Sequence, residues 1–345
     1  MGLERGKDIV NWWGQTFRSA GLSRFLQCRL NACLVRWLPF VVSRGYLNLM
    51  GRVYYGLNPQ EREEIRENLY AVLGRLPSAY PVDQAVRRTF RGLFAHYYEK
   101  LITAYARVEK VYRFVQERVE CQAESLLVEA LSRGRGVILV TGHFGGVEFM
   151  PVILALKGYP VTMVVRFKTE RLKRALVPRG EDLGITLLDS GKSDGVLFKA
   201  MDSLTKNRIL ITECDEFEAW RPAQKRWVEF LGCSCPMDRT LELLHRRYRS
   251  PVIMALNRRV TETRYQLKFH DLTAPEQGLG SEDIQQRALR ILEQHICEAP
   301  DQWYQWRKVR TVLGRQIFAA EEASLAPEGN GTLTAKGSVL FTHEG

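Results

Sequence analysis

The stretch of sequence that decides the fold reads Val137-Ile138-Leu139-Val140-Thr141-Gly142-His143-Phe144-Gly145-Gly146-Val147-Glu148. Its first part, residues 137–141, is uncharged and rich in β-branched residues, a pattern typical of a strand buried on both faces. A glycine-rich turn containing His143 follows, and a helical pattern then begins with Glu148. Such a turn puts the histidine at the carboxyl end of a sheet strand, where α/β proteins form their functional sites.

The spacing of His143 and Glu148 predicts acid–base chemistry. A carboxylate one helical turn into the helix can reach back to a ring nitrogen of the histidine, which fixes the tautomer. The other ring nitrogen is then free to accept a proton from a hydroxyl, as in a serine-protease triad whose nucleophile is supplied by the substrate. Gly145 and Gly146 let the backbone approach the reacting centre closely, so they are predicted substrate-binding residues. The alternative interpretation is a structural turn histidine.

Short apolar runs also follow this stretch, at Val161–Val165, Ile185–Leu188, Ile209–Thr212 and Val252–Leu256. Helical patterns separate most of them, at Glu148–Leu156, Glu170–Val177, Asp194–Leu204 and Arg239–Tyr248. This alternation predicts an α/β fold with a largely parallel central sheet flanked by helices. Thr263–His270 alternates between apolar and polar residues and is predicted to be an antiparallel edge strand.

The chain is expected to divide into three parts. Residues 1–119 are predicted to form an N-terminal helical region that associates with membranes, and residues 120–318 an α/β domain. Residues 319–345 are polar and glycine-rich, which is typical of a flexible tail. The longest predicted helix, Asp83–Val108, carries an aromatic stripe that is expected to pack in the core.

Four arginines interrupt the apolar stretch between residues 25 and 57, each seven or eight positions from the next: Arg29, Arg36, Arg44 and Arg52. On a helix this spacing puts them on one face. The pattern is that of a basic amphipathic segment lying in the membrane interface, and a spanning helix is not predicted. The alternative is a helix packed on the core with a solvated arginine edge.

The net charge of +11 and the pI of about 9.4 indicate anionic partners. Nucleic acid, acidic lipid headgroups, phosphorylated substrates and an acidic carrier protein all satisfy this condition, although no nucleic-acid-binding module is recognisable. The seven cysteines are scattered and odd in number, which favours a reduced compartment. Cys233 and Cys235 lack the second close pair that zinc sites favour, so no metal is predicted.

Two further motifs carry no prediction. Gly191-Lys192-Ser193 is similar to the end of a phosphate-binding loop, but the position of that motif's first glycine is Thr186, and Ser193 is interpreted as a helix cap. Cys214 has no base nearby in the sequence and is interpreted as a buried strand-end residue.

Gly142-His143-Phe144-Gly145-Gly146-Val147-Glu148 resembles the Gly-His-Phe-Gly-Asn-Trp-Glu signature of the bacterial lipid A biosynthesis acyltransferases, within the lysophospholipid acyltransferase superfamily. Weaker matches follow the family's order over most of the chain: Glu67-Asn68-Leu69, Arg166, Arg179, Glu213-Cys214-Asp215, Phe230-Leu231-Gly232 and Pro300–Arg307. Gly146-Val147 replaces the family's Asn-Trp, and Glu213 replaces an aspartate. A different lipid acceptor therefore stays open as an alternative.

The resemblance implies an O-acyltransferase in which His143 is the general base and Glu148 its orienting partner. An acceptor hydroxyl would attack an acyl thioester directly, with acyl carrier protein or coenzyme A as co-substrate and without a cofactor or metal. The acceptor would be a lipid A precursor or a related phosphorylated glycolipid, contacted by Arg166, Arg179 and Asp215.

The partners implied by the resemblance are acyl carrier protein, the glycolipid and an anionic membrane surface, and not nucleic acid. The expected location is the cytoplasmic face of the bacterial inner membrane, in a peripheral or monotopic arrangement. The alternative from another class is a non-catalytic membrane or lipid-binding protein that retains the fold.

Overall fold

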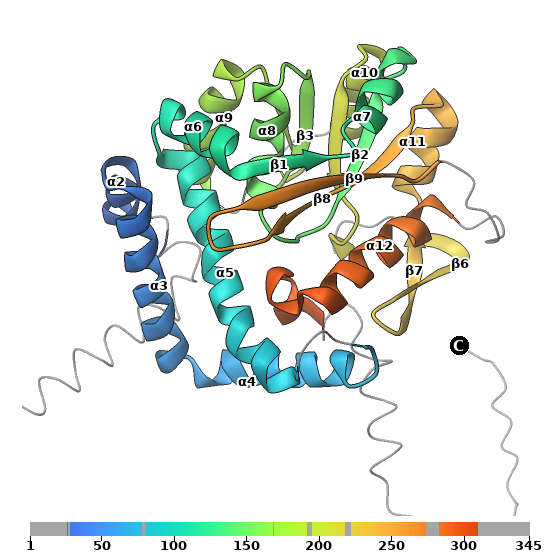
Figure 1. Cartoon of the computed structure of the whole chain (residues 1–345). Coiled ribbons are helices and arrows are strands. Elements are labelled where there is room, and N and C mark those ends of the chain that lie inside the picture. Colours follow the sequence, from blue (N-terminus) through green and yellow to red (C-terminus); the bar gives the residue numbers. More distant parts are fainter. Residues whose placement is uncertain are drawn as a thin grey trace, which may run out of the picture.

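The computed structural model describes residues 26, 28–77, 81–167, 169–191, 195–217, 222–273 and 283–309 (Figure 1). The predicted tail at 319–345 and the predicted helix cap Ser193 lie outside these residues. The described chain is a mixed α/β structure of eleven α-helices and a central seven-stranded sheet. This confirms the predicted fold class.

The central sheet has the strand order β1-β9-β8-β2-β5-β3-β4. Its strands are β1 (Val119–Gln122), β2 (Val137–Thr141), β3 (Val161–Val165), β4 (Thr186–Asp189), β5 (Ile209–Glu213), β8 (Val252–Arg259) and β9 (Tyr265–Asp271). All neighbouring pairs are parallel except β8 and β9. The predicted antiparallel strand is therefore β9, but it is not at the edge, because β1 pairs with its outer side.

The fully buried strand β2 separates two hydrophobic cores. Ile138 and Val140 belong to one core, whereas Val137 and Leu139 belong to the other. Successive side chains of a strand point to opposite faces of the sheet, so a continuous apolar run is required where both faces are covered. The apolar stretch that begins the deciding sequence thus places its last residues, and His143 after them, at the middle of the sheet.

Five helices form the N-terminal region: α2 (Arg29–Trp37), α3 (Phe40–Leu57), α4 (Pro59–Leu73), α5 (Val82–Tyr105) and α6 (Val108–Arg118). The predicted amphipathic segment is two helices, because Pro39 lies between α2 and α3. Within the described ranges, none of the helices combines the length and the apolar composition that a membrane crossing requires. In Figure 1 the helices α2, α3 and α5 lie at one side of the sheet, opposite the hairpin of β6 (Pro222–Phe230) and β7 (Cys233–Asp238).

The remaining helices are α7 (Ser125–Ser132), α8 (Met150–Leu156), α9 (Glu170–Asp182), α10 (Val196–Thr205), α11 (Thr240–Tyr248) and α12 (Ile284–Glu298). A separate antiparallel hairpin, β6 (Pro222–Phe230) and β7 (Cys233–Asp238), was not predicted. Cys214, Cys233 and Cys235 are buried, and burial raises the pKa of each thiol, as expected for unreactive core residues.

Helix α5 joins the N-terminal region to the site. Its predicted aromatic stripe is in the core, with Phe90 and Phe94 buried. The helix packs on two 3-10 helices, η1 (Val147–Phe149) and η3 (Pro300–Gln302). A Cβ atom at Gly92 would lie 1.7 Å from the carbonyl oxygen of Asp301, so the backbones approach more closely than any side chain allows.

Candidate active site

His143 follows β2 and is held by a carboxylate that follows β5. The two strands pair in parallel with Thr141 opposite Glu213, so the segments beyond their carboxyl ends lie side by side. The Asp215 carboxylate accepts the His143 backbone N–H at 3.1 and 3.0 Å, and its Oδ1 lies 2.9 Å from Nδ1 of the same histidine. The sequence analysis predicted that Asp215 binds the substrate, whereas in the structure Asp215 contacts His143 directly.

Asp215 is anchored from a third direction by the indole of Trp303, whose Nε1–H donates to Oδ2 at 2.8 Å. The carboxylate is buried, with no exposed side-chain surface. Burial alone favours the neutral acid, but the hydrogen bonds and the charge of His143 outweigh it and hold the pKa of Asp215 below its usual range. Asp215 is therefore an ionised acceptor, and it keeps a proton on Nδ1 of His143 in both the charged and the neutral ring.

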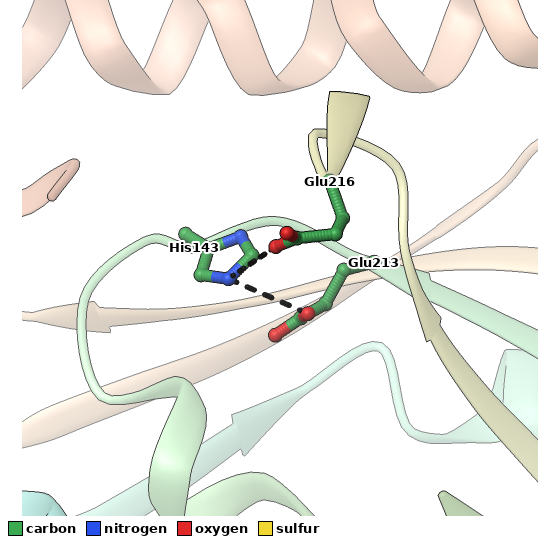
Figure 2. Close-up of side chains that lie close together, drawn as sticks. All are labelled: His143, Glu213 and Glu216. Atoms are coloured by element: carbon green, nitrogen blue, oxygen red, sulfur yellow. Dashed lines mark ion pairs between the residues drawn. The ribbon is translucent and has the colours of Figure 1, made fainter. Parts of the chain in front are cut away.

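The other ring nitrogen faces two glutamates (Figure 2). Nε2 of His143 lies 3.4 Å from Glu213 Oε2 and 3.2 Å from Glu216 Oε2. Burial lowers the pKa of the ring, but Glu213, Asp215 and Glu216 together raise it to about 9. In the free protein the imidazole is thus positively charged at neutral pH.

Glu148 does not make the contact that the sequence predicted. Its Oε1 lies 3.0 Å from Lys100 Nζ and 3.6 Å from His96 Nε2, both on α5, and within the described part of the chain it forms no ion pair with His143. Glu148 belongs to the short helix η1, which packs on α5, and its carboxylate therefore pairs with side chains of α5. It still lies near the site, since its charge helps to raise the pKa of Glu213, after burial and nearer carboxylates.

Three further side chains at the site were missed by the sequence interpretation: His96, Lys100 and Tyr304. The His96 ring stacks on Tyr304, with centroids 3.7 Å apart and an interplanar angle of 15°, and Tyr304 is edge-on to His143 at 5.4 Å. His96 and Lys100 are four residues apart and so share one helix face, a signal that the aromatic stripe concealed. The backbone N–H of Tyr304 also donates to the His143 carbonyl at 3.2 Å.

The glycine turn is bonded within the protein. The Gly145 N–H donates to Gln302 O at 2.9 Å, and the Gly146 N–H donates to Asn257 O at 2.7 Å. Gly145 has a φ of +56°, and a Cβ there would lie 2.1 Å from the Asn257 carbonyl oxygen. The glycines therefore let the backbone approach β8 and η3. Their N–H groups donate to protein carbonyl oxygens, whereas the sequence analysis predicted that the glycines contact the substrate.

The two predicted substrate-binding arginines lie in different settings. Arg179 caps the C-terminal end of α5: its guanidinium donates to the carbonyl oxygens of Thr103 and Ala106, and to that of Ile102 at 3.4 Å. Arg166 is exposed and follows β3 at the carboxyl edge of the sheet, two strands from β2. Only Arg166 thus keeps a position from which it can reach a ligand at this edge.

The fold and the site define an α/β enzyme whose histidine, at the carboxyl end of a central parallel strand, is oriented by a buried aspartate. The family model of the bacterial lipid A biosynthesis acyltransferase matches residues 28–308, and the chain belongs to that family. The match spans every site residue described above. No curated protein matches the chain. The protein is accordingly an acyltransferase of lipid A biosynthesis.

Proposed function

We propose that this chain transfers a fatty acyl group from an acyl thioester to a hydroxyl of a lipid A precursor or a related phosphorylated glycolipid, with His143 as general base. The observation that carries the proposal is the contact of Asp215 Oδ1 with His143 Nδ1 at 2.9 Å. It fixes the ring so that the other nitrogen, Nε2, faces Glu213 and Glu216. Family membership supports the acyltransferase class and the lipid A pathway.

In this mechanism neutral His143 accepts the proton of the acceptor hydroxyl at Nε2 while the hydroxyl oxygen attacks the thioester carbonyl carbon. The tetrahedral intermediate then collapses, the carbon–sulfur bond breaks, and the sulfur takes the proton back from Nε2 and leaves as a thiol. Asp215 keeps Nδ1 protonated and stabilises the transient imidazolium, the role that the sequence assigned to Glu148. A positioned base of this kind contributes about 10²–10⁴-fold to the rate.

Glu213 and Glu216 are proposed to accept hydrogen bonds from the acceptor hydroxyls. In the free protein their charges help to keep the ring protonated, because each lies within 3.4 Å of Nε2. Hydrogen bonds from the acceptor spread that negative charge away from the ring and so favour the neutral imidazole. Acceptor binding and activation of the base are thereby coupled. Arg166 is the proposed phosphate contact.

Stabilising the oxyanion is proposed as the task of Tyr304. The N–H groups of residues 143–146 are all bonded within the protein, so they are not free to act as donors. The Tyr304 hydroxyl has no hydrogen bond among the residues that the structure describes. Burial and the neighbouring carboxylates, Glu148 first, raise its pKa well above the usual value, so the hydroxyl stays a neutral donor.

We propose that α2 and α3 dock on an anionic membrane, the cytoplasmic face of the bacterial inner membrane, and the exposed apolar surface of these helices supports the docking. Six of their large apolar side chains are 43% exposed or more: Leu30, Trp37, Val41, Val42, Leu49 and Val53. The guanidinium of Arg107 lies 4.4 Å from the Trp37 ring. Exposed apolar residues beside arginines are the composition of helices that lie in the lipid interface. The positive net charge likewise suits acyl carrier protein, an acidic donor.

The test is acyl transfer from labelled acyl carrier protein to a panel of phosphorylated glycolipids, with acyl coenzyme A as the second donor. Wild type is expected to label one acceptor class, and His143→Ala to lose this activity while its circular dichroism spectrum is unchanged. Full activity in His143→Ala would refute the mechanism. Binding of the acceptor by wild type without transfer from either donor would favour the non-catalytic lipid-binding alternative.

A further inference from the structure

Three potential ligand atoms converge at the end of β2. Figure 2 shows Glu213 and Glu216 approaching the same ring nitrogen of His143, and one atom from each of the three side chains lies within 4.8 Å of the other two. The separations from Nε2 are 3.4 Å to Glu213 Oε2 and 3.2 Å to Glu216 Oε2. Imidazole nitrogen and carboxylate oxygen are both ligand types that zinc binds in proteins.

The separations fit ligands that share a centre. Atoms placed about 2.0–2.1 Å from a tetrahedral zinc ion lie roughly 3.3 Å from one another. Neither glutamate has the geometry of a hydrogen bond to Nε2, and in the described chain that nitrogen has no other hydrogen-bond acceptor. The two oxygens therefore lie beside the nitrogen and not in line with an N–H bond. Ligands that share one metal ion have this arrangement.

The surroundings of the three side chains supply the outer contacts that metal ligands need. A metal-bound histidine almost always donates its second ring N–H to a carboxylate or carbonyl, and Asp215, fully buried, occupies this place at Nδ1. Lys308 Nζ lies 3.3 Å from Glu216 Oε1, the oxygen that does not face the ring. Glu213 has no ion pair other than that with His143 in the described residues. The oxygens that face Nε2 are thus left available.

We propose that His143, Glu213 and Glu216 bind a divalent transition-metal ion of the zinc class and that this ion inhibits acyl transfer. Binding itself follows from the three ligands, and the metal ion displaces to solvent the proton that Nε2 carries in the free protein. Inhibition rests on the proposed function, because a metal ion on Nε2 occupies the nitrogen that must accept the hydroxyl proton. Nitrogen and oxygen ligands in a four-coordinate site favour Zn²⁺, whereas Mg²⁺ requires octahedral coordination by oxygen, so Mg²⁺ is not expected to compete.

The binding test uses the full chain after removal of metals with a chelator. Zn²⁺ is titrated in competition with a chromophoric chelator, for wild type, Glu213→Gln, Glu216→Gln, His143→Gln and the exposed control Glu129→Gln on α7. We expect one ion per wild-type and control chain, at least tenfold weaker binding in each glutamate variant, and loss of the site in His143→Gln. Asp215→Asn should weaken binding by about 10–100-fold, the usual effect of removing an outer-shell partner.

A second measurement separates loss of ligands from loss of folding. Zn²⁺ should raise the Tm of wild type and Glu129→Gln, raise that of Glu213→Gln by less, and leave that of His143→Gln unchanged, because only a folded site that binds the ion gains stability. Variants that remain folded without Zn²⁺ and bind it like wild type would overturn the proposal. So would a wild-type protein that binds Zn²⁺ no more tightly than Mg²⁺.

The activity measurement tests the second half of the inference. Zn²⁺ at saturating concentration should abolish acyl transfer, and excess chelator should restore it. Zn²⁺ bound by these ligands with undiminished transfer would overturn the inhibitory role. If the chain binds Zn²⁺ as expected but transfers no acyl group even with chelator, the metal site stands and the proposed function fails.

Discussion

Asp215 holds His143 at two places, accepting its backbone N–H and contacting its ring at Nδ1 2.9 Å away. The first contact fixes the turn and the second fixes the imidazole that the turn carries. Because Trp303 donates to the same carboxylate, the orientation of the base depends on a residue far along the chain. A change at Asp215 therefore affects the tautomer, the ring orientation and the turn together.

Asp215→Asn is expected to lower kcat by about 10²–10⁴-fold, because an amide can donate to Nδ1 and stabilise the wrong tautomer. Glu148→Gln should cost much less, since Glu148 pairs with Lys100 and His96. Steady-state acyl transfer by the two variants gives the comparison, with the exposed Asp202→Asn as control. Equal losses in both, at unchanged Tm, would restore Glu148 as the orienting residue.

The pH dependence of kcat/KM should follow the ionisation of His143. The nearby carboxylates raise its pKa to about 9 against the effect of burial, and only the neutral ring is a base. Activity in the presence of chelator should therefore rise with pH, about tenfold per unit, up to pH about 9. Glu213→Gln removes one of the charges that raise the pKa, so its profile should move to lower pH. A profile that is flat between pH 6 and 9 would contradict the assignment.

Tyr304→Phe tests the proposed oxyanion donor. The ring can keep its stacking on His96, so folding and KM should change little. The loss of one donor to a developing oxyanion costs about 10²–10³-fold in kcat. Tyr112→Phe, an exposed tyrosine on α6, is the control. A rise in KM at constant kcat would instead make Tyr304 a substrate-binding residue.

Arg179→Ala should destabilise the protein and leave the chemistry alone. It removes the guanidinium donors that cap the carbonyl groups at the end of α5. Lost hydrogen bonds to a partly buried charged group cost about 1–3 kcal/mol, measurable as a lower midpoint of denaturant unfolding. Arg174→Ala changes an exposed arginine on α9, the helix that also carries Arg179, and should have no such effect. A raised KM for the acceptor with unchanged stability would return Arg179 to the substrate-binding set.

The sequence carried enough to predict the fold class and the central strand, because a strand buried on both faces needs a continuous apolar run. It did not predict β1, since Val119–Gln122 has only four residues, none of them buried, and lacks a clear alternation of apolar and polar residues. Nor did it predict the β6–β7 hairpin, in which Arg226 and Glu229 interrupt the apolar pattern. The position of β9 inside the sheet depends on which strand pairs with it, and periodicity does not encode that choice.

The candidate site likewise contains residues that the sequence could predict and residues that it could not. His143 could be found because the strand, the turn and the glycines are contiguous in sequence. Its partner could not be identified by spacing, because Asp215 reaches the ring through the pairing of β2 with β5, a contact across 72 positions. Glu148 was predicted to be the partner because it is the nearest acidic residue after His143 in the sequence. Tyr304 comes from a more distant segment still, and His96 comes from α5, which precedes the strand.

Two hydrogen bonds, from Trp303 to Asp215 and from Asn68 to the carbonyl of Trp306, determine when the site can form during synthesis of the chain. A ribosome makes the histidine, the aspartate and the N-terminal helices long before the residues that lock them together. A nascent chain that stops before Pro300 contains His143 and Asp215, but lacks the indole that anchors the aspartate and the tyrosine that stacks beside the base. Acyl transfer should therefore begin only after residues 300–306 have been synthesised and have packed against Asp215 and Asn68.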